Sequence, residues 1–551
     1  MSHLTNGDLT KHRTDIKNIF YNDNVDFIKG IELINYSTYS VSDYAPFIRY
    51  EYDTYDNYEK DMQNLQDSSK YDLIEFIYLN NVTEIVDQAD RNSIYYTTNY
   101  SFDQALEDVG VNNLVYSGNG IKIGTLESGI PTTNINYTGK TLIINDESTT
   151  TTPHSFHVTS IIGGNSGIAQ DSELYCVSVN DVSFFDSINW LISQNVNIIN
   201  ISWGDAGGIY TSNSSFLDYV SRSTRVSFVV SAGNYYDNES INSYSTGLNV
   251  ISVASIDVNS RISGFSSAGL KSPDAGYLLK PTLSAPGGNL IGIPNVNVVL
   301  RGTSYSAPIV TGIVALLMEQ YPYLKSHPEA VIALLIASCN KLPSQVNLWD
   351  HDAGSGLINY EKAQNLYNQG NIINFLTNSS MQNGQVVASK SLSVTYGDKV
   401  TIKGTWLHNS QTYNPQNNIT IPEFTDYRIE IRNSSNVTIR TIQTNSNIFN
   451  DEFTFTSNGT FTIYVIMDSD KIGYDYEYGS VVLDFQDHIH TYQHHYSTHN
   501  MTYHRKYCEC GLYVLVQHSW IMIPYDDGEN IGLQQYCPDC GQLGYIIMMS
   551  K

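Results

Sequence analysis

The stretch RGTSYSAPIVTGIVALLMEQYP, residues 301–322, places a turn of small residues directly before an apolar helix. Pro308 fits the first turns of that helix, where its missing N–H costs little. Free backbone N–H groups at a helix N-terminus stabilise negative charge, so Ser304 stands where a nucleophilic hydroxyl is needed. Taken alone, such a serine is more often a helix cap, and the choice depends on the surrounding chain.

The segment around this helix, from residue 113 to about 368, alternates short apolar strands with turns and helices. The strands have the sequences GIKIGTLES, ELYCVSV, VNIINISWG, VSFVVSAGN and NVISVASI. This alternation indicates an α/β fold with a mostly parallel sheet and helices on both faces. In such sheets, functional residues gather at the carboxyl ends of the strands.

Three polar residues stand where such function is expected. Glu127 ends an apolar strand, a costly place for a charge unless a partner needs it. His154 begins a second helix in PHSFHVTSIIGG, where a general base can reach out of the scaffold. Asn234 follows the strand VSFVVSAGN, and its amide suits an oxyanion donor. The types and places of Ser304, His154 and Asn234 thus fit a nucleophile, a base and an oxyanion donor, and Glu127 needs a partner nearby.

The motifs ESGI, HSFHV, SAGN and GTSYSAP, in this order, resemble those of the subtilisin-like serine proteases, or subtilases. The stretches INISWG, SGFSSAG, LSAPGG and GSGLINYEKA continue the family's order, so the resemblance covers about residues 100–368. It implies a subtilisin-like fold and an endopeptidase that hydrolyses proteins or peptides through an acyl-enzyme. No cofactor is implied for catalysis.

Carried over by position, the resemblance assigns a role to each of these residues. Ser304 would be the nucleophile, His154 the general base, and Glu127 the acid that orients the histidine. Asn234 and the backbone N–H of Ser304 would form the oxyanion hole. His157, one turn after His154, is expected to be structural.

The resemblance also implies two strips of chain that bind the substrate mainly through the backbone. One would lie along the bound peptide and the other would form the second wall of the specificity pocket. They consist of Ser202, Trp203 and Gly204, and of Ser231, Ala232 and Gly233. Trp203 could equally be a bulky side chain that only fills the wall of the groove. The sequence does not indicate the substrate preference.

The acid departs from the family pattern, because members carry Asp where this chain has Glu127. Glu supplies the same charge and acceptor, but its extra methylene moves the carboxylate by about 1 Å, which can cost about a hundredfold in rate. Ser155 and Phe156 also make the histidine motif bulkier, and Tyr305 and Ser306 replace the commoner Met and Ala. Two functions stay open: an active protease, or an impaired subtilase scaffold that acts as a surface binding protein.

Changes of pattern along the chain suggest four parts. Residues 1–98 contain a strand–helix–strand unit, from about residue 46, that is either propeptide-like or a retained accessory domain. Residues 99–370 form the predicted peptidase domain. Residues 371–486 alternate like an antiparallel β-sandwich that serves as a spacer or stabilising domain. Residues 487–551 form a small module rich in His and Cys.

Four of the six cysteines lie in this last part: Cys508, Cys510, Cys537 and Cys540. Two cysteine knuckles of this kind predict a tetrahedral zinc site like a zinc ribbon. The C-x-C spacing of the first knuckle is tight, so one ligand could instead be His504 or His518. A disulfide pair outside the cell is the main rival.

The whole-chain composition limits the partners. A formal net charge of −26 over 551 residues disfavours nucleic acid and anionic membranes. No apolar run reaches the roughly 18–20 residues of a membrane span. The first residues lack the apolar core of a signal peptide, while the family resemblance favours secretion or the cell surface. The resemblance allows a structural calcium ion, but no contiguous acidic loop matches a calcium cage. The oligomeric state is not indicated.

Overall fold

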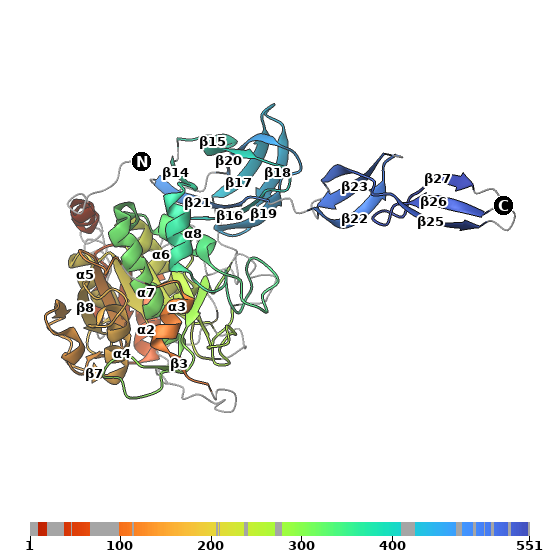
Figure 1. The fold of residues 1–551 in the computed structure, drawn as a ribbon. Coiled ribbons are helices and arrows are strands. Elements are labelled where there is room, and N and C mark those ends of the chain that lie inside the picture. Colours follow the sequence, from red (N-terminus) through yellow and green to blue (C-terminus); the bar gives the residue numbers. More distant parts are fainter. Residues whose placement is uncertain are drawn as a thin grey trace.

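The computed structural model describes sixteen stretches of the 551-residue chain (Figure 1). They are residues 9–18, 38–45, 47–66, 98–112, 115–204, 208, 210–235, 241–269, 278–378, 380–408, 425–469, 476–488, 492–500, 502–508, 512–526 and 531–548. The part predicted to be a peptidase, residues 99–370 (the peptidase part), is followed along the chain by a β-sandwich and by a tail of two small sheets.

A seven-stranded sheet forms the centre of the peptidase part, in the order β12-β11-β10-β9-β4-β8-β6. Every neighbouring pair in it is parallel. The strands are β4 (Lys122–Glu127), β6 (Leu142–Ile144), β8 (Glu173–Ser178), β9 (Ile198–Ile201), β10 (Ser227–Ser231), β11 (Ile251–Ile256) and β12 (Leu283–Pro286). The parallel α/β fold predicted from the apolar strand runs is confirmed.

Helices cover both faces of this sheet. Helices α4 (Pro153–Gly163), α7 (Thr303–Gln320) and α8 (Pro328–Ser338) share one hydrophobic core, and α5 (Phe184–Ser193) and α6 (Ser212–Thr224) share the other. Because side chains alternate along a strand, Ile198 of β9 points into the first core and Ile199 into the second. Helices α3 (Phe102–Asp108) and α9 (Tyr360–Asn368) flank this body.

The N-terminal residues pack onto α5 and α6. A helical stretch at residues 9–18 precedes the hairpin of β1 (Thr38–Val41) and β2 (Ile48–Glu51), and α2 (Tyr55–Gln66) follows. The buried Arg13 donates to the carbonyls of Thr224, at 2.8 Å, and Val196, at 2.7 Å. The ring of Phe47 contacts that of Phe216, with centroids 5.4 Å apart. This segment therefore shares the peptidase core, while the second strand of the predicted strand–helix–strand unit, expected at residues 71–79, lies outside the described residues.

Short strands tie loops together around the sheet. Strand β3 (Tyr100–Ser101) pairs in parallel with β13 (Leu290–Ile291), and β5 (Ile130–Pro131) pairs in parallel with β7 (Thr151–Thr152). The second pair lies directly between the carboxyl end of β4 and the start of α4, so it fixes the approach to His154.

The predicted β-sandwich is confirmed as two four-stranded antiparallel sheets, β14-β21-β16-β19 and β15-β20-β17-β18. Side chains such as Trp406, Phe449 and Tyr427 fill the space between the sheets. The strands are β14 (Ile372–Asn378), β15 (Gln385–Val394), β16 (Lys399–Trp406), β17 (Asp426–Asn433), β18 (Thr438–Gln443), β19 (Ile448–Thr454), β20 (Gly459–Ser469) and β21 (Tyr476–Gln486).

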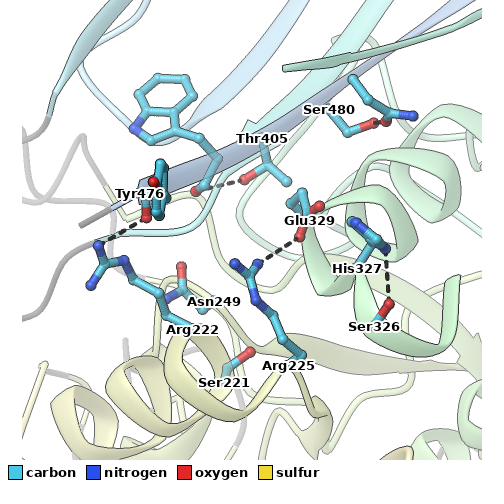
Figure 2. Close-up of polar contacts among 12 residues, drawn as sticks. Ser221, Arg222, Arg225, Asn249, Ser326, His327, Glu329, Thr405, Tyr476 and Ser480 are labelled. Carbon is cyan, nitrogen blue, oxygen red and sulfur yellow. Dashed lines mark hydrogen bonds and ion pairs between the residues drawn. The ribbon is translucent and has the colours of Figure 1, made fainter. Parts of the chain in front are cut away.

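Charged side chains join the sandwich to the peptidase part (Figure 2). Arg225, at the end of α6, lies with Nη1 3.9 Å from Glu329 Oε2 and stacks its guanidinium on the ring of Tyr478 in β21. Figure 2 shows Arg222 reaching toward Tyr476, whose carbonyl accepts from it at 3.1 Å. Arg225 and Glu329 both belong to the peptidase part and are buried, and Tyr478 of the sandwich covers Arg225, so separating the two parts would expose this pair to solvent.

The tail consists of two three-stranded antiparallel sheets. The first contains β22 (Tyr492–Thr498), β23 (Tyr503–Cys508) and β24 (Tyr513–Gln517). The second contains β25 (Ile521–Asp526), β26 (Ile531–Tyr536) and β27 (Leu543–Met548). Within the described part of the chain, no helix combines the length and the apolar character that a membrane crossing requires.

Candidate active site

Glu127 and His154 come from neighbouring elements at the carboxyl edge of the sheet. Glu127 is the last residue of β4 and its side chain is 1% exposed, whereas the side chain of His154 is 27% exposed. His154 follows Pro153 at the start of α4, and Thr152 caps this helix by accepting from the Ser155 N–H at 3.2 Å. Pro153 and the Thr152 cap both stabilise the start of α4. They therefore fix the backbone position from which the His154 side chain extends.

The two carboxylate oxygens of Glu127 have different partners. Oε2 lies 3.1 Å from His154 Nδ1. Oε1 accepts from the backbone N–H of Ser202 at 3.2 Å and from Asn200 Nδ2 at 3.4 Å. Strand β9 is the neighbour of β4 in the sheet. Asn200 of β9 and Ser202, just after it, therefore lie beside the Glu127 side chain. Oε1 is therefore hydrogen-bonded, whereas Oε2 faces His154 Nδ1 without accepting a hydrogen bond from any described residue.

Ser202 also connects the acid to the serine. Its backbone N–H holds Glu127, and its carbonyl accepts from Ser304 Oγ at 3.1 Å. Ser304 lies in the first turn of α7, after the N-cap residue Gly302. The next residue, Tyr305, places its ring 5.5 Å from the ring of His154, measured between centroids. The residue after Ser304 therefore contacts His154, while the Ser304 hydroxyl itself donates to Ser202.

Asn234 is oriented by the start of α7. Its Oδ1 accepts from the backbone N–H of Thr303 at 2.9 Å and from the Thr303 hydroxyl at 3.0 Å. An amide oxygen that accepts these two bonds leaves Nδ2 as the donor end of the side chain. Gly302 has φ +150°, and a Cβ there would lie 3.4 Å from Asn234 Nδ2 and 3.7 Å from the Ser304 N. A side-chain atom at position 302 would thus lie in van der Waals contact with both donors.

Comparison with known proteins identifies this architecture. Residues 118–356 match the model of the subtilase family. These residues form a subtilase domain. The chain is 33% identical over 221 residues to fervidolysin from Fervidobacterium pennivorans, covering 37% of this chain and 29% of the relative. It is 30% identical over 225 residues to a thermostable alkaline protease from Halalkalibacterium halodurans, covering 37% and 58%. The chain thus spans less than two thirds of the length of these relatives.

A solved structure shares this likeness at lower identity. The serine protease of Aeromonas sobria is 14% identical, with a TM-score of 0.38, and the match covers 67% of this chain and 89% of that one.

The two strips of the subtilase domain that are predicted to bind substrate are joined by a residue that the motifs do not indicate. Asn242 Nδ2 donates to the carbonyl of Trp203 at 3.0 Å and to that of Ser231 at 3.1 Å. The backbone N–H of Asn242 donates to the carbonyl of Ala232 at 2.7 Å. Gly204, with φ +152°, leaves room for this amide, because a Cβ there would lie only 2.2 Å from Asn242 Oδ1. Asn242 therefore sets the distance between the strips.

The other ends of the strips are also held. The backbone N–H of Gly233 donates to Thr303 Oγ1 at 3.0 Å, which ties the second strip to the start of α7. The ring of Trp203 packs on Tyr244, with centroids 5.0 Å apart. This packing fits the reading of Trp203 as a bulky side chain in the wall of the groove.

His157 differs from His154 in its surroundings. Burial lowers the pKa of His157 to about 4, and the neighbouring His154 adds to this effect. His157 is therefore neutral near pH 7, and its ring lies 6.2 Å from that of Tyr305.

The tail brings a different set of metal-binding side chains together than the four cysteines of the predicted zinc site. His504, His518, Cys537 and Cys540 converge. Cys508 lies elsewhere, with its Sγ 3.1 Å from His488 Nε2, and Cys510 lies outside the described residues. In the described ranges, no cluster of three or more carboxylates converges that could form a calcium cage.

Proposed function

We propose that the chain is a serine endopeptidase with Ser304 as nucleophile, His154 as general base, and Glu127 as the orienting acid. The observation that carries the proposal is the double engagement of Glu127. One oxygen lies 3.1 Å from His154 Nδ1, and the other accepts the Ser202 N–H at 3.2 Å. A carboxylate held on both sides can keep the imidazole in one tautomer and stabilise the imidazolium that forms in the reaction.

The reaction then follows from the arrangement of these groups. Ser304 Oγ attacks the scissile carbonyl while His154 Nε2 accepts its proton. Asn234 Nδ2 and the backbone N–H of Ser304 donate to the oxyanion in the space beside Gly302. His154 returns the proton to the leaving amine. In the second step His154 accepts a proton from water, the water attacks the acyl-enzyme, and the proton is returned to Ser304 Oγ.

The proposed substrates are proteins or peptides in extended conformation. Such a segment would pair with the backbone of Ser202, Trp203 and Gly204 on one side and of Ser231, Ala232 and Gly233 on the other. The spacing that Asn242 imposes on these two strips supports this mode of binding.

A fluorophosphonate probe tests the proposal, because it reacts only with an activated serine. We expect the native chain to be labelled and Ser304→Ala to be unlabelled. Ser306→Ala is the matched control, since Ser306 lies in the same helix, is buried and makes no hydrogen bond through its hydroxyl. Absence of labelling in a folded native chain would instead favour the catalytically impaired scaffold that acts as a surface binding protein.

We also propose the four-part layout of residues 1–98, 99–370, 371–486 and 487–551, with secretion or surface display as the family resemblance suggests. Helix α9 ends at Asn368 and β14 begins at Ile372, which supports the middle boundary. Limited proteolysis of the Ser304→Ala chain tests the boundaries, and fractionation of expressing cells tests the location.

A further inference from the structure

The tail contains a group of four metal-binding side chains that come from both of its sheets. His504 lies in β23, and His518 follows β24 directly. Cys537 follows β26, and Cys540 lies in the turn before β27. Two ligands thus belong to the first sheet and its edge, and two belong to the second.

The distances among the donor atoms match a tetrahedral site. His504 Nδ1 and His518 Nδ1 are 3.4 Å apart, Cys540 Sγ is 3.3 Å from His518 Nδ1, and Cys537 Sγ is 4.0 Å from His504 Nδ1. All four atoms lie within 4.8 Å of one another. Zinc bonds of about 2.0–2.1 Å to nitrogen and about 2.3 Å to sulfur give tetrahedral edges of roughly 3.3–3.8 Å. The separations of 3.3 Å and 3.4 Å fall in this range, and the longest, up to 4.8 Å, would have to shorten by about 1 Å around a bound ion.

Burial points to three of these four residues, because His504, His518 and Cys537 are buried and Cys540 is partly buried. Among the described residues after 487, the side chains classed as buried belong to His504, Cys508, His518 and Cys537. Large apolar side chains of the same sheets are exposed, including Leu515 at 47% and Ile547 at 58%. Small sheets that bury potential ligands and leave their apolar side chains in water lack the core that would hold them together.

We propose that His504, His518, Cys537 and Cys540 bind one zinc ion, and that this ion joins the two sheets of the tail into one folded module. Two imidazole and two thiolate ligands in tetrahedral geometry favour zinc over the hard cations. The binding free energy of a structural zinc ion would supply the stability that the described side chains do not supply. This inference is independent of proteolytic activity.

Metal analysis of the full-length chain tests the ligand set. The Ser304→Ala background prevents self-digestion, and zinc is measured per chain in it and in a His518→Ala, Cys540→Ser double variant. We expect the double variant to lose one equivalent. His499→Ala is the matched control, because His499 is an exposed histidine of the same tail, and it should keep the full content. Equal zinc content in all three chains, or no zinc in the parent chain, would overturn the proposal.

A second readout separates metal binding from simple misfolding of the variant. Co²⁺ substituted for zinc in the parent chain should give the visible absorption of a tetrahedral site with thiolate ligands. Removal of the metal by a chelator should make residues 487–551 sensitive to an added protease while the sandwich stays intact, and added zinc should restore resistance. A disulfide between Cys537 and Cys540 in the purified chain, seen by mass spectrometry, would contradict the proposal.

Discussion

Glu127 Oε2 lies 3.1 Å from His154 Nδ1, while the other oxygen of Glu127 accepts the backbone N–H of Ser202. The carbonyl of Ser202 in turn accepts from Ser304 Oγ. Ser202, which directly follows β9, therefore contacts both Glu127 and Ser304.

Asn234→Ala should remove the side-chain donor to the oxyanion. Loss of one such donor costs about 10²–10³ in kcat. KM should change little, because this interaction strengthens only in the transition state. Steady-state kinetics on a chromogenic peptide measures both constants, and a large rise in KM with unchanged kcat would instead assign Asn234 to substrate binding.

Gly302→Ala should abolish most activity, because its Cβ would enter the space between Asn234 Nδ2 and the Ser304 N. Its φ of +150° adds backbone strain. Gly120→Ala controls for strain, since Gly120 also has a positive φ, +69°, with nothing within 4 Å of the added atom. If Gly302→Ala and Gly120→Ala had equal thermal stability and lost equal activity, the oxyanion would not bind beside Gly302.

Asn242→Ala should loosen the two substrate-binding strips without removing a catalytic group. We expect KM for extended peptides to rise about tenfold or more, with a smaller effect on short ester substrates, because only the former use both strips. Parallel assays on a long peptide and a short ester measure this difference. Equal losses on both substrates would point to a general structural role.

Acid should loosen the loop before His154. The hydroxyl and the backbone N–H of Thr150 both donate to Asp181. These two bonds, the hydroxyl's having the larger effect, lower the pKa of Asp181 to about 2. A carboxylate with a lowered pKa stabilises the fold above its unfolded value near 4, and this stabilisation is lost as the pH falls toward 2. Asp181→Asn should therefore lower the melting temperature at neutral pH but flatten its fall between pH 4 and pH 2, as thermal unfolding across this pH range would show. An unchanged acid profile in the variant would exclude this role.

How far the sequence predicts the site depends on how local each contact is. Glu127, His154, Asn234 and Ser304 stand in short motifs at strand or helix ends, so their meeting could be expected from the parallel sheet. Asn242 stands in no motif, and its contacts with Trp203 and Ser231 arise only when two separate loops fold together.

The tail shows the same limit. The cysteine spacing predicts Cys508 and Cys510 as zinc ligands, but strand pairing decides which side chains converge. His504 pairs with Val516 across β23 and β24, which brings it close to His518 on the same sheet. Sequence spacing indicates the ligand types, whereas the register selects the ligands.

The central claim is that this site is built around a glutamate, and Glu127→Asp tests it most directly. Shortening the side chain should draw the carboxylate away from either His154 or the Ser202 N–H. We therefore predict that kcat/KM on a peptide substrate falls about 10–100-fold, with thermal stability nearly unchanged. An increase in kcat/KM above that of the native chain would contradict the account, because it would show that Glu127 is a defect in a site still shaped for aspartate.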